Sequence, residues 1–164
     1  MPLIEIETVI NSPQKRCFLL ALSVDLHTVS TQQTKESIVA GVRSGILQLG
    51  DTVTFRARHF GIWQTLTSKV TELEAPIYFC DVMQQGAFQY MRHEHHFERQ
   101  GNATLMRDVF EFASPLGWLG KAVDTLFLKR YLSHFLKERC SVIKQYAENG
   151  AWQEILPLMD NQGQ

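Results

Sequence analysis

The feature that most constrains this chain is a long amphipathic segment that follows a series of strand-like segments. Residues 118–146 contain no proline, and Gly120 is their only glycine. Apolar side chains recur in this segment at intervals of three and four residues, which predicts a helix of about eight turns with one apolar stripe. A helix of this kind must bury its stripe against another layer of the fold. The stripe contains Leu119, Val123, Leu126, Phe127, Tyr131, Phe135, Val142 and Tyr146.

The residues before this helix predict an antiparallel sheet. Residues 3–10 alternate and are rich in β-branched side chains, as in a strand. Ser12 and Pro13 then predict the N-cap and first residue of a short helix, and a second short helix is expected over 25–30. Short turns separate the later strands, which favours a meander. These later strands are expected over 38–42, 52–60, 62–73, 77–83, 88–99 and 103–113.

The sheet has only one large partner, the C-terminal helix. At 1.5 Å per residue this helix is about 45 Å long, more than a typical strand is wide. The sheet is therefore expected to curl around the helix, and such a grip tends to leave space between the layers. The predicted fold class is α+β, with a bent seven-stranded antiparallel sheet around a long C-terminal helix.

Size and composition fit a single globular domain. The chain has 164 residues, of which 45% are hydrophobic and 20% charged. The formal net charge of −1 argues against a dedicated nucleic-acid binder, because such proteins carry a basic excess. We expect one ligand-binding domain over residues 1–150 and a C-terminal tail over 151–164.

The three cysteines and the N-terminal residues indicate in which cellular compartment the protein is expected. Cys17, Cys80 and Cys140 are far apart and form no CxxC pair, so neither a zinc knuckle nor a redox motif is predicted. Scattered thiols fit a reducing compartment. No signal peptide and no apolar run of about 20 residues is visible. A soluble cytoplasmic protein is therefore expected.

Three strings resemble the START-like, birch-pollen-allergen-like superfamily, also called the SRPBCC or polyketide cyclase/dehydrase group. Residues 76–88 (PIYFCDVMQQGAF) are similar to P-x-x-F-x-D-x-Q-x-x-G-P-F, and residues 91–97 (MRHEHHF) to W-x-H-x-H-x-F. Residues 104–108 (TLMRD), with Pro-Leu-Gly at 115–117, are similar to T-x-M-x-D…P-L-G. Two positions depart from these patterns: Met83 stands near the family's glutamine, and Ala87 replaces its second proline.

The resemblance covers nearly the whole chain and implies a helix-grip fold with an internal cavity. Relatives in this superfamily include lipid-transfer START domains, coenzyme Q-binding proteins, plant hormone receptors and aromatic cyclases. The resemblance therefore implies a hydrophobic small-molecule ligand, such as a lipid, a quinone or a polyketide-like aromatic.

The hairpin over residues 88–113 carries the sharpest candidate site. Side chains alternate between the two faces of a strand, so the inward face of the first strand is expected to hold Met91, His93, His95 and Phe97. On the returning strand the inward face is expected to hold Thr104, Met106, Asp108, Phe110 and Phe112. If Phe97 pairs with Thr104, His93 lies opposite Asp108.

Three interpretations of the His93–Asp108 pair stay open. The two side chains form a structural hydrogen bond in the core, since neither tolerates burial alone. Alternatively, they anchor a polar group of a ligand in a mostly apolar pocket. In the third interpretation His93, oriented by Asp108, is a catalytic base, or the His-x-His pair with Asp108 ligates a metal. The string His93–His96 is not HExxH, because residue 97 is Phe, and no G-x-S-x-G elbow is present.

Two arginines of the predicted helix could face the cavity. Arg130 falls near the apolar stripe and Arg139 follows Phe135 by one turn. Either cation could pair with Asp108 or with an acidic ligand, or it could extend to the rim. The other basic side chains of the helix form either a solvated face or a face for transient contact with a membrane surface.

The function predicted from these residues is binding or carriage of a hydrophobic small molecule, without a metal or cofactor. The alternatives are a cyclase or dehydratase that uses His93 and Asp108, and an interaction module with a filled core. The oligomeric state stays open. The side chains expected to contact the ligand are Phe55, Met91, His93, His95, Phe97, Met106, Asp108, Phe110, Phe112, Val123, Phe127 and Arg130.

Overall fold

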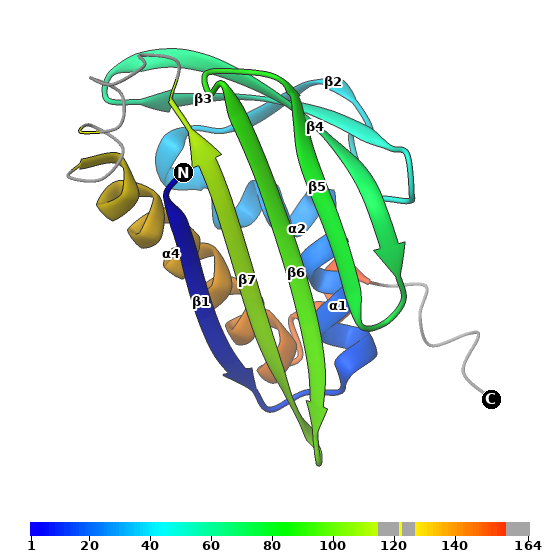
Figure 1. The fold of residues 1–164 in the computed structure, drawn as a ribbon. Helices are drawn as coiled ribbons and strands as arrows, with labels where there is room; N and C mark the ends of the chain where they lie inside the picture. The colour runs from blue at the N-terminus through cyan, green and yellow to red at the C-terminus, as the bar shows by residue number, and fades with distance from the viewer. Residues whose placement is uncertain (115–121, 123–126, 157–164) are drawn as a thin grey trace.

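The computed structural model describes residues 1–114, 122 and 127–156. Figure 1 shows a curved sheet with α1, α2 and α4 on one of its faces. The helical elements are α1 (Gln14–Leu22), α2 (Val24–Ser30), the 3₁₀ turn η1 (Gln32–Thr34), α4 (Lys129–Glu148) and α5 (Trp152–Ile155). The strands are β1 (Leu3–Ile10), β2 (Ser37–Gly41), β3 (Thr52–His59), β4 (Ile62–Glu74), β5 (Tyr78–Gln85), β6 (Tyr90–Gln100) and β7 (Ala103–Ala113).

The seven strands form one antiparallel sheet in the order β1-β7-β6-β5-β4-β3-β2. Strands β2 to β7 are a meander, and the first strand of the chain pairs with the last. The predicted α+β class, with seven antiparallel strands around a C-terminal helix, is thus confirmed. The described part of that helix is α4, so Trp118 and Val123 lie outside the described residues.

The start of α1 differs from the prediction. The helix begins at Gln14, and the residue in the N-cap position is Pro13, not Ser12. The Ser12 hydroxyl accepts a hydrogen bond of 3.2 Å from Arg16. The residue in the N-cap position makes no side-chain hydrogen bond to the helix. The Ser12 carbonyl accepts a bond of 2.8 Å from the buried Thr104 hydroxyl. Ser12 therefore joins α1 to β7 rather than capping the helix.

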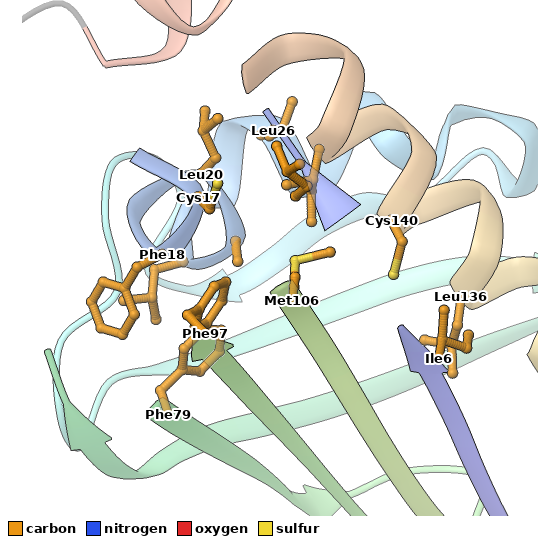
Figure 2. Packing of buried hydrophobic residues seen from close by; sticks show 14 of the residues in the cluster. Ile6, Cys17, Phe18, Leu20, Leu26, Phe79, Phe97, Met106, Leu136 and Cys140 are labelled. Atoms are coloured by element: carbon orange, nitrogen blue, oxygen red, sulfur yellow. The ribbon is translucent and has the colours of Figure 1, made fainter. Parts of the chain in front are cut away.

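A cluster of buried hydrophobic residues lies where α1 and the second half of α4 meet the sheet. Figure 2 shows Phe18 of α1 beside Phe79 and Phe97 of the sheet, with ring centroids 5.8 and 5.5 Å away. Met106 and Cys140 pack in the same cluster. All three cysteines are buried and free, and a free cysteine packs as a small side chain with a weak S–H donor.

The residues after α4 pack back onto the domain. The guanidinium of Arg16 lies 4.0 Å from the ring centre of Trp152, and Leu156 is buried in the core cluster. The first residues of the expected tail form the short helix α5. None of the helices described here is long and apolar enough to cross a lipid bilayer.

Neighbouring residues of β1 offer a test of this packing. Ile10 is fully buried, whereas Val9 is 50% exposed on the other face of the same strand. We expect Ile10→Ala to lower the free energy of unfolding by about 2–5 kcal/mol, because it removes buried methyl groups and leaves a cavity. Val9→Ala should cost about 0.5 kcal/mol or less. Chemical denaturation measures both values, and equal losses would contradict the assignment of the two faces.

Candidate functional site

A cavity of about 460 Å³ lies between the sheet and the first half of α4. Its wall is mostly apolar. On the sheet side it includes Phe55, Ala57, Leu66, Met91 and Phe110, and on the helix side Leu128, Leu132, Phe135 and Leu136. A smaller cavity of about 70 Å³ shares part of this wall, including Phe55, Ser68, Asp81, His93 and Arg139.

The structure divides the predicted ligand contacts into three groups. Four of them line the larger cavity: Phe55, Met91, His93 and Phe110. Five others are buried in the domain but do not belong to that wall: His95, Phe97, Met106, Asp108 and Phe112. The inward faces predicted for β6 and β7 are confirmed, since these side chains alternate with more exposed ones. A side chain that is buried in this domain therefore does not always line the cavity.

The contacts predicted on the C-terminal helix are not in the wall. Phe127 is 60% exposed and packs on Phe60 with ring centroids 5.4 Å apart. Arg130 is exposed and does not line the cavity, which fits the alternative that its side chain extends to the rim. Further along the helix, Arg139 is buried and lines both cavities. Val123 lies outside the described residues.

The pairing of β6 with β7 corrects the predicted register by two residues. Phe97 lies opposite Met106 rather than Thr104, so Asp108 lies opposite His95 and not opposite His93. The turn consists of Gly101 and its neighbour Asn102, and Gly101 has φ of 61°, which glycine adopts without strain. A shift of two residues keeps every side chain on its predicted face.

Asp108 is the centre of a buried polar network. One of its oxygens, Oδ1, accepts a hydrogen bond of 3.1 Å from Nε2 of His93. Nδ1 of His95 lies 2.8 Å from the same oxygen, close enough for an ion pair but poorly aligned for a hydrogen bond. The thiol of Cys140 donates to Oδ2 at 3.3 Å. The predicted hydrogen bond between His93 and Asp108 is thus present, although the two residues are not directly opposite.

Asp81 of β5 extends the network to a third strand. Nε2 of His95 donates to Oδ1 of Asp81 at 3.2 Å, and the Ser68 hydroxyl donates to Oδ2 at 2.7 Å. The ring of Phe79 stacks on His95 at 4.1 Å. His95 therefore lies between two carboxylates. Asp81 went unpredicted as a site residue, although alternation along β5 puts it on the same face as Phe79.

The ionisation of these groups follows from their neighbours. Burial opposes a charge on Asp81 and Asp108, but hydrogen bonds and the positive charge from the histidines outweigh it, so the pKa of both carboxyls lies below the ordinary value. Burial also opposes a charge on His95, yet Asp108 beside it raises the pKa of that imidazole. Burial, and then the charge of His95, lower the pKa of His93 to about 4. His93 is therefore neutral near pH 7.

Arg139 balances the remaining charge. Its side chain is buried, donates to the Ala21 carbonyl at 3.1 Å and lies 4.0 Å from Asp108. With His95 protonated, two positive groups face the two carboxylates. Buried charges are tolerated only when paired in this way. The signal for Arg139 was present in the sequence, four residues after Phe135, but it did not distinguish Arg139 from Arg130.

Two further polar pairs border the cavity. Nε2 of His27 lies 2.6 Å from Glu36, and its ring stacks on Phe55 at 4.3 Å. Nδ1 of His59, which lines the same cavity, lies 2.7 Å from the Tyr131 hydroxyl and connects the end of β3 to α4. Sequence patterns gave no signal for the His59–Tyr131 pair, because it joins elements distant in the chain.

Among the described residues, one group has the composition of a metal site. Asp81, His93 and His95 each offer a ligand atom, and these three atoms lie within 4.8 Å of one another. The sequence pointed to the two histidines with Asp108, whereas the group found here contains Asp81 instead.

Comparison with known proteins defines the class of fold. Protein TTHA0849 from Thermus thermophilus superposes with a TM-score of 0.69 at 14% identity, over 90% of this chain and 100% of the other. A START superfamily protein from Mycobacterium smegmatis gives 0.67 at 14%, over 87% and 97%. Major latex-like protein 151 from Panax ginseng gives 0.66 at 14%, over 89% and 97%.

These likenesses show that the chain has the START-like, birch-pollen-allergen-like fold that its sequence strings predicted. No protein-family model and no curated protein sequence matches the chain. At this level of identity the likeness concerns the fold alone.

The low pKa of His93 predicts how stability depends on pH. Between pH 6.5 and pH 4 the unfolded chain protonates this imidazole, whose ordinary pKa is 6.5, while the folded protein holds it neutral down to about 4. The unfolded state binds more protons in this window, so stability falls as the pH falls. Through this group, the free energy of unfolding of the wild type should fall by an amount on the order of 3 kcal/mol between pH 6.5 and pH 4. We expect His93→Gln not to show this fall.

Urea denaturation at a series of pH values, with a chelator present, measures this effect. His96→Gln is the matched control, because it makes the same substitution on the outer face of the same strand. An unchanged slope in His93→Gln would show that His93 is not held neutral by its surroundings.

Proposed function

We propose that this protein binds or carries a hydrophobic small molecule in the cavity between the sheet and α4. The observation that supports this most directly is the size and nature of the cavity. Its volume of about 460 Å³ lies within the range of roughly 300–1,000 Å³ typical of small-molecule sites. Apolar side chains from both layers form most of its wall, so the free energy of binding would come mainly from apolar burial.

The polar residues at one end of the cavity would orient the ligand. Ser68, Asp81, His93 and Arg139 line the place where the larger and smaller cavities adjoin. A few placed polar groups in an apolar pocket are typical of sites that select one orientation. We therefore expect an amphipathic ligand whose polar end lies against these residues. The resemblance to lipid-transfer START domains supports a lipid, a quinone or a polyketide-like aromatic.

Loading of such a ligand could use a transient contact with a membrane surface. The tip between β3 and β4 exposes Phe60 and Ile62, and Phe60 contacts the exposed ring of Phe127. Lys129 and Arg130 follow at the start of α4 and are both exposed. Apolar side chains next to basic ones suit the interface of an anionic membrane.

We assign the ligand-binding domain to residues 1–150, with 151–164 as its tail.

A second candidate is a cyclase or dehydratase in which His93 moves a proton. The observation that favours it is that His93 lines the cavity and is held by Asp108 at 3.1 Å. A pKa of about 4 makes His93 a weak base near neutral pH, so binding without turnover is the function the site supports better. In an enzyme of this kind, His93→Ala would abolish turnover of the bound ligand and retain its binding.

Filling the cavity tests the binding proposal. Ala57 is buried on β3 and lines the cavity. We expect Ala57→Phe to occupy the space that a ligand needs and to weaken binding of the neutral fluorescent probe N-phenyl-1-naphthylamine at least about tenfold. Fluorescence titration measures this affinity, and native mass spectrometry checks whether an apolar ligand purifies with the wild-type protein.

Ala40→Phe is the control, since Ala40 is exposed on the edge strand β2 and adds the same ring outside the cavity. Both variants are first compared by thermal melting. Equal probe binding by Ala57→Phe and the wild type would place the probe elsewhere, and absence of any binding to the wild type would overturn the proposal.

A further inference from the structure

Three potential ligand side chains converge from two neighbouring strands. His93 and His95 are two residues apart on β6 and so share a face, and their ring centroids lie only 3.8 Å apart. Asp81 is directly opposite His93 on β5. Ligand atoms of the three residues all lie within 4.8 Å of one another. Because all three stand on central strands of the sheet, the backbone fixes their relative positions.

Asp108 contacts both imidazoles. It accepts a hydrogen bond of 3.1 Å from Nε2 of His93 and lies 2.8 Å from Nδ1 of His95. Each ring is thereby left with one nitrogen that Asp108 does not use, Nδ1 of His93 and Nε2 of His95. The second of these already lies 3.2 Å from Oδ1 of Asp81. In metal sites the ligating histidine commonly gives its other nitrogen to a carboxylate, which orients the ring.

We propose that Asp81, His93 and His95 form a binding site for one divalent transition-metal ion of the zinc or iron(II) type. Two imidazoles and one carboxylate are the protein ligands of many such sites. Metal–ligand bonds of about 2.0–2.2 Å need ligand atoms about 3–3.5 Å apart, so small side-chain rotations from the present separations complete the site. Calcium and magnesium ions are disfavoured, because they prefer a shell made of oxygen ligands.

The surrounding charges and the access to the cavity define what an ion would do at this place. Asp81 and Asp108 carry two negative charges, which Arg139 and protonated His95 balance without an ion. A divalent cation bound to His95 would displace the proton of that imidazole. Asp81 and His93 also line the larger and the smaller cavity. Three protein ligands leave at least one coordination position, which would face the cavity and take water or an oxygen atom of a bound molecule.

Metal binding to tag-free, chelator-treated protein tests the proposal. We expect isothermal titration with Zn²⁺ to give one equivalent bound by the wild type and by His96→Gln, whose substituted side chain lies on the outer face of β6. Binding should be lost in Asp81→Asn and His93→Gln. Asp108→Asn should weaken it about 10–100-fold, as is typical when a carboxylate behind a ligating histidine is removed. Circular dichroism confirms that each variant is folded.

A second measurement needs only the wild-type protein and so does not depend on the folding of any variant. Addition of Co²⁺ should shift the imidazole proton resonances of His93 and His95 and leave those of His134, on α4, near their original positions. The proposal is overturned if the wild type binds no Zn²⁺ or Co²⁺. It is also overturned if binding is unchanged in folded Asp81→Asn, or if the shifted resonances belong to other histidines.

Discussion

The structure depends on how one helix packs against one face of a curved sheet. The second half of α4 buries Cys140, Ile143 and Ala147 in the dense cluster with α1 and β1. The first half faces β3, β4, β6 and β7 across the cavity, with Leu132 and Leu136 in its wall. One apolar stripe thus has two tasks. At one end it completes a core, and at the other it forms half of a pocket.

The polar network lies where these two regions meet. Asp81, His95 and Asp108 cross three adjacent strands, and Arg139 reaches them from α4. Buried charges of this kind are stable only as a complete set, since removal of one member leaves another unpaired. The same set gives the cavity its polar end. A structural role and a role in binding a ligand or an ion therefore coexist in these residues.

The proposed ligand site and the proposed metal site share Asp81 and His93 but make separate demands. The first requires the apolar volume beside Phe55 and Phe110, and the second requires only the side chains on β5 and β6 with Asp108 behind them. Ala57→Phe fills the volume without changing a ligand atom. Either property can therefore fail without the other.

Sequence alone determined the elements and the faces of β6 and β7. Alternation with a period of two put His93, His95 and Asp108 inside, because this period follows from local backbone geometry. The period near 3.6 predicted the last helix, but the side chains that α4 buries are not those of the predicted stripe; they are Leu132, Leu136, Arg139, Cys140, Ile143 and Ala147. Tertiary structure decided what local geometry does not contain. The turn at Gly101 selected a register that pairs His95 with Asp108, and the packing of α4 on the sheet decided that the face with Arg139 is buried and the opposite face with Arg130 is exposed. Asp81 joined the site because the register of β5 with β6 puts it directly opposite His93, and alternation along a single strand does not contain that register.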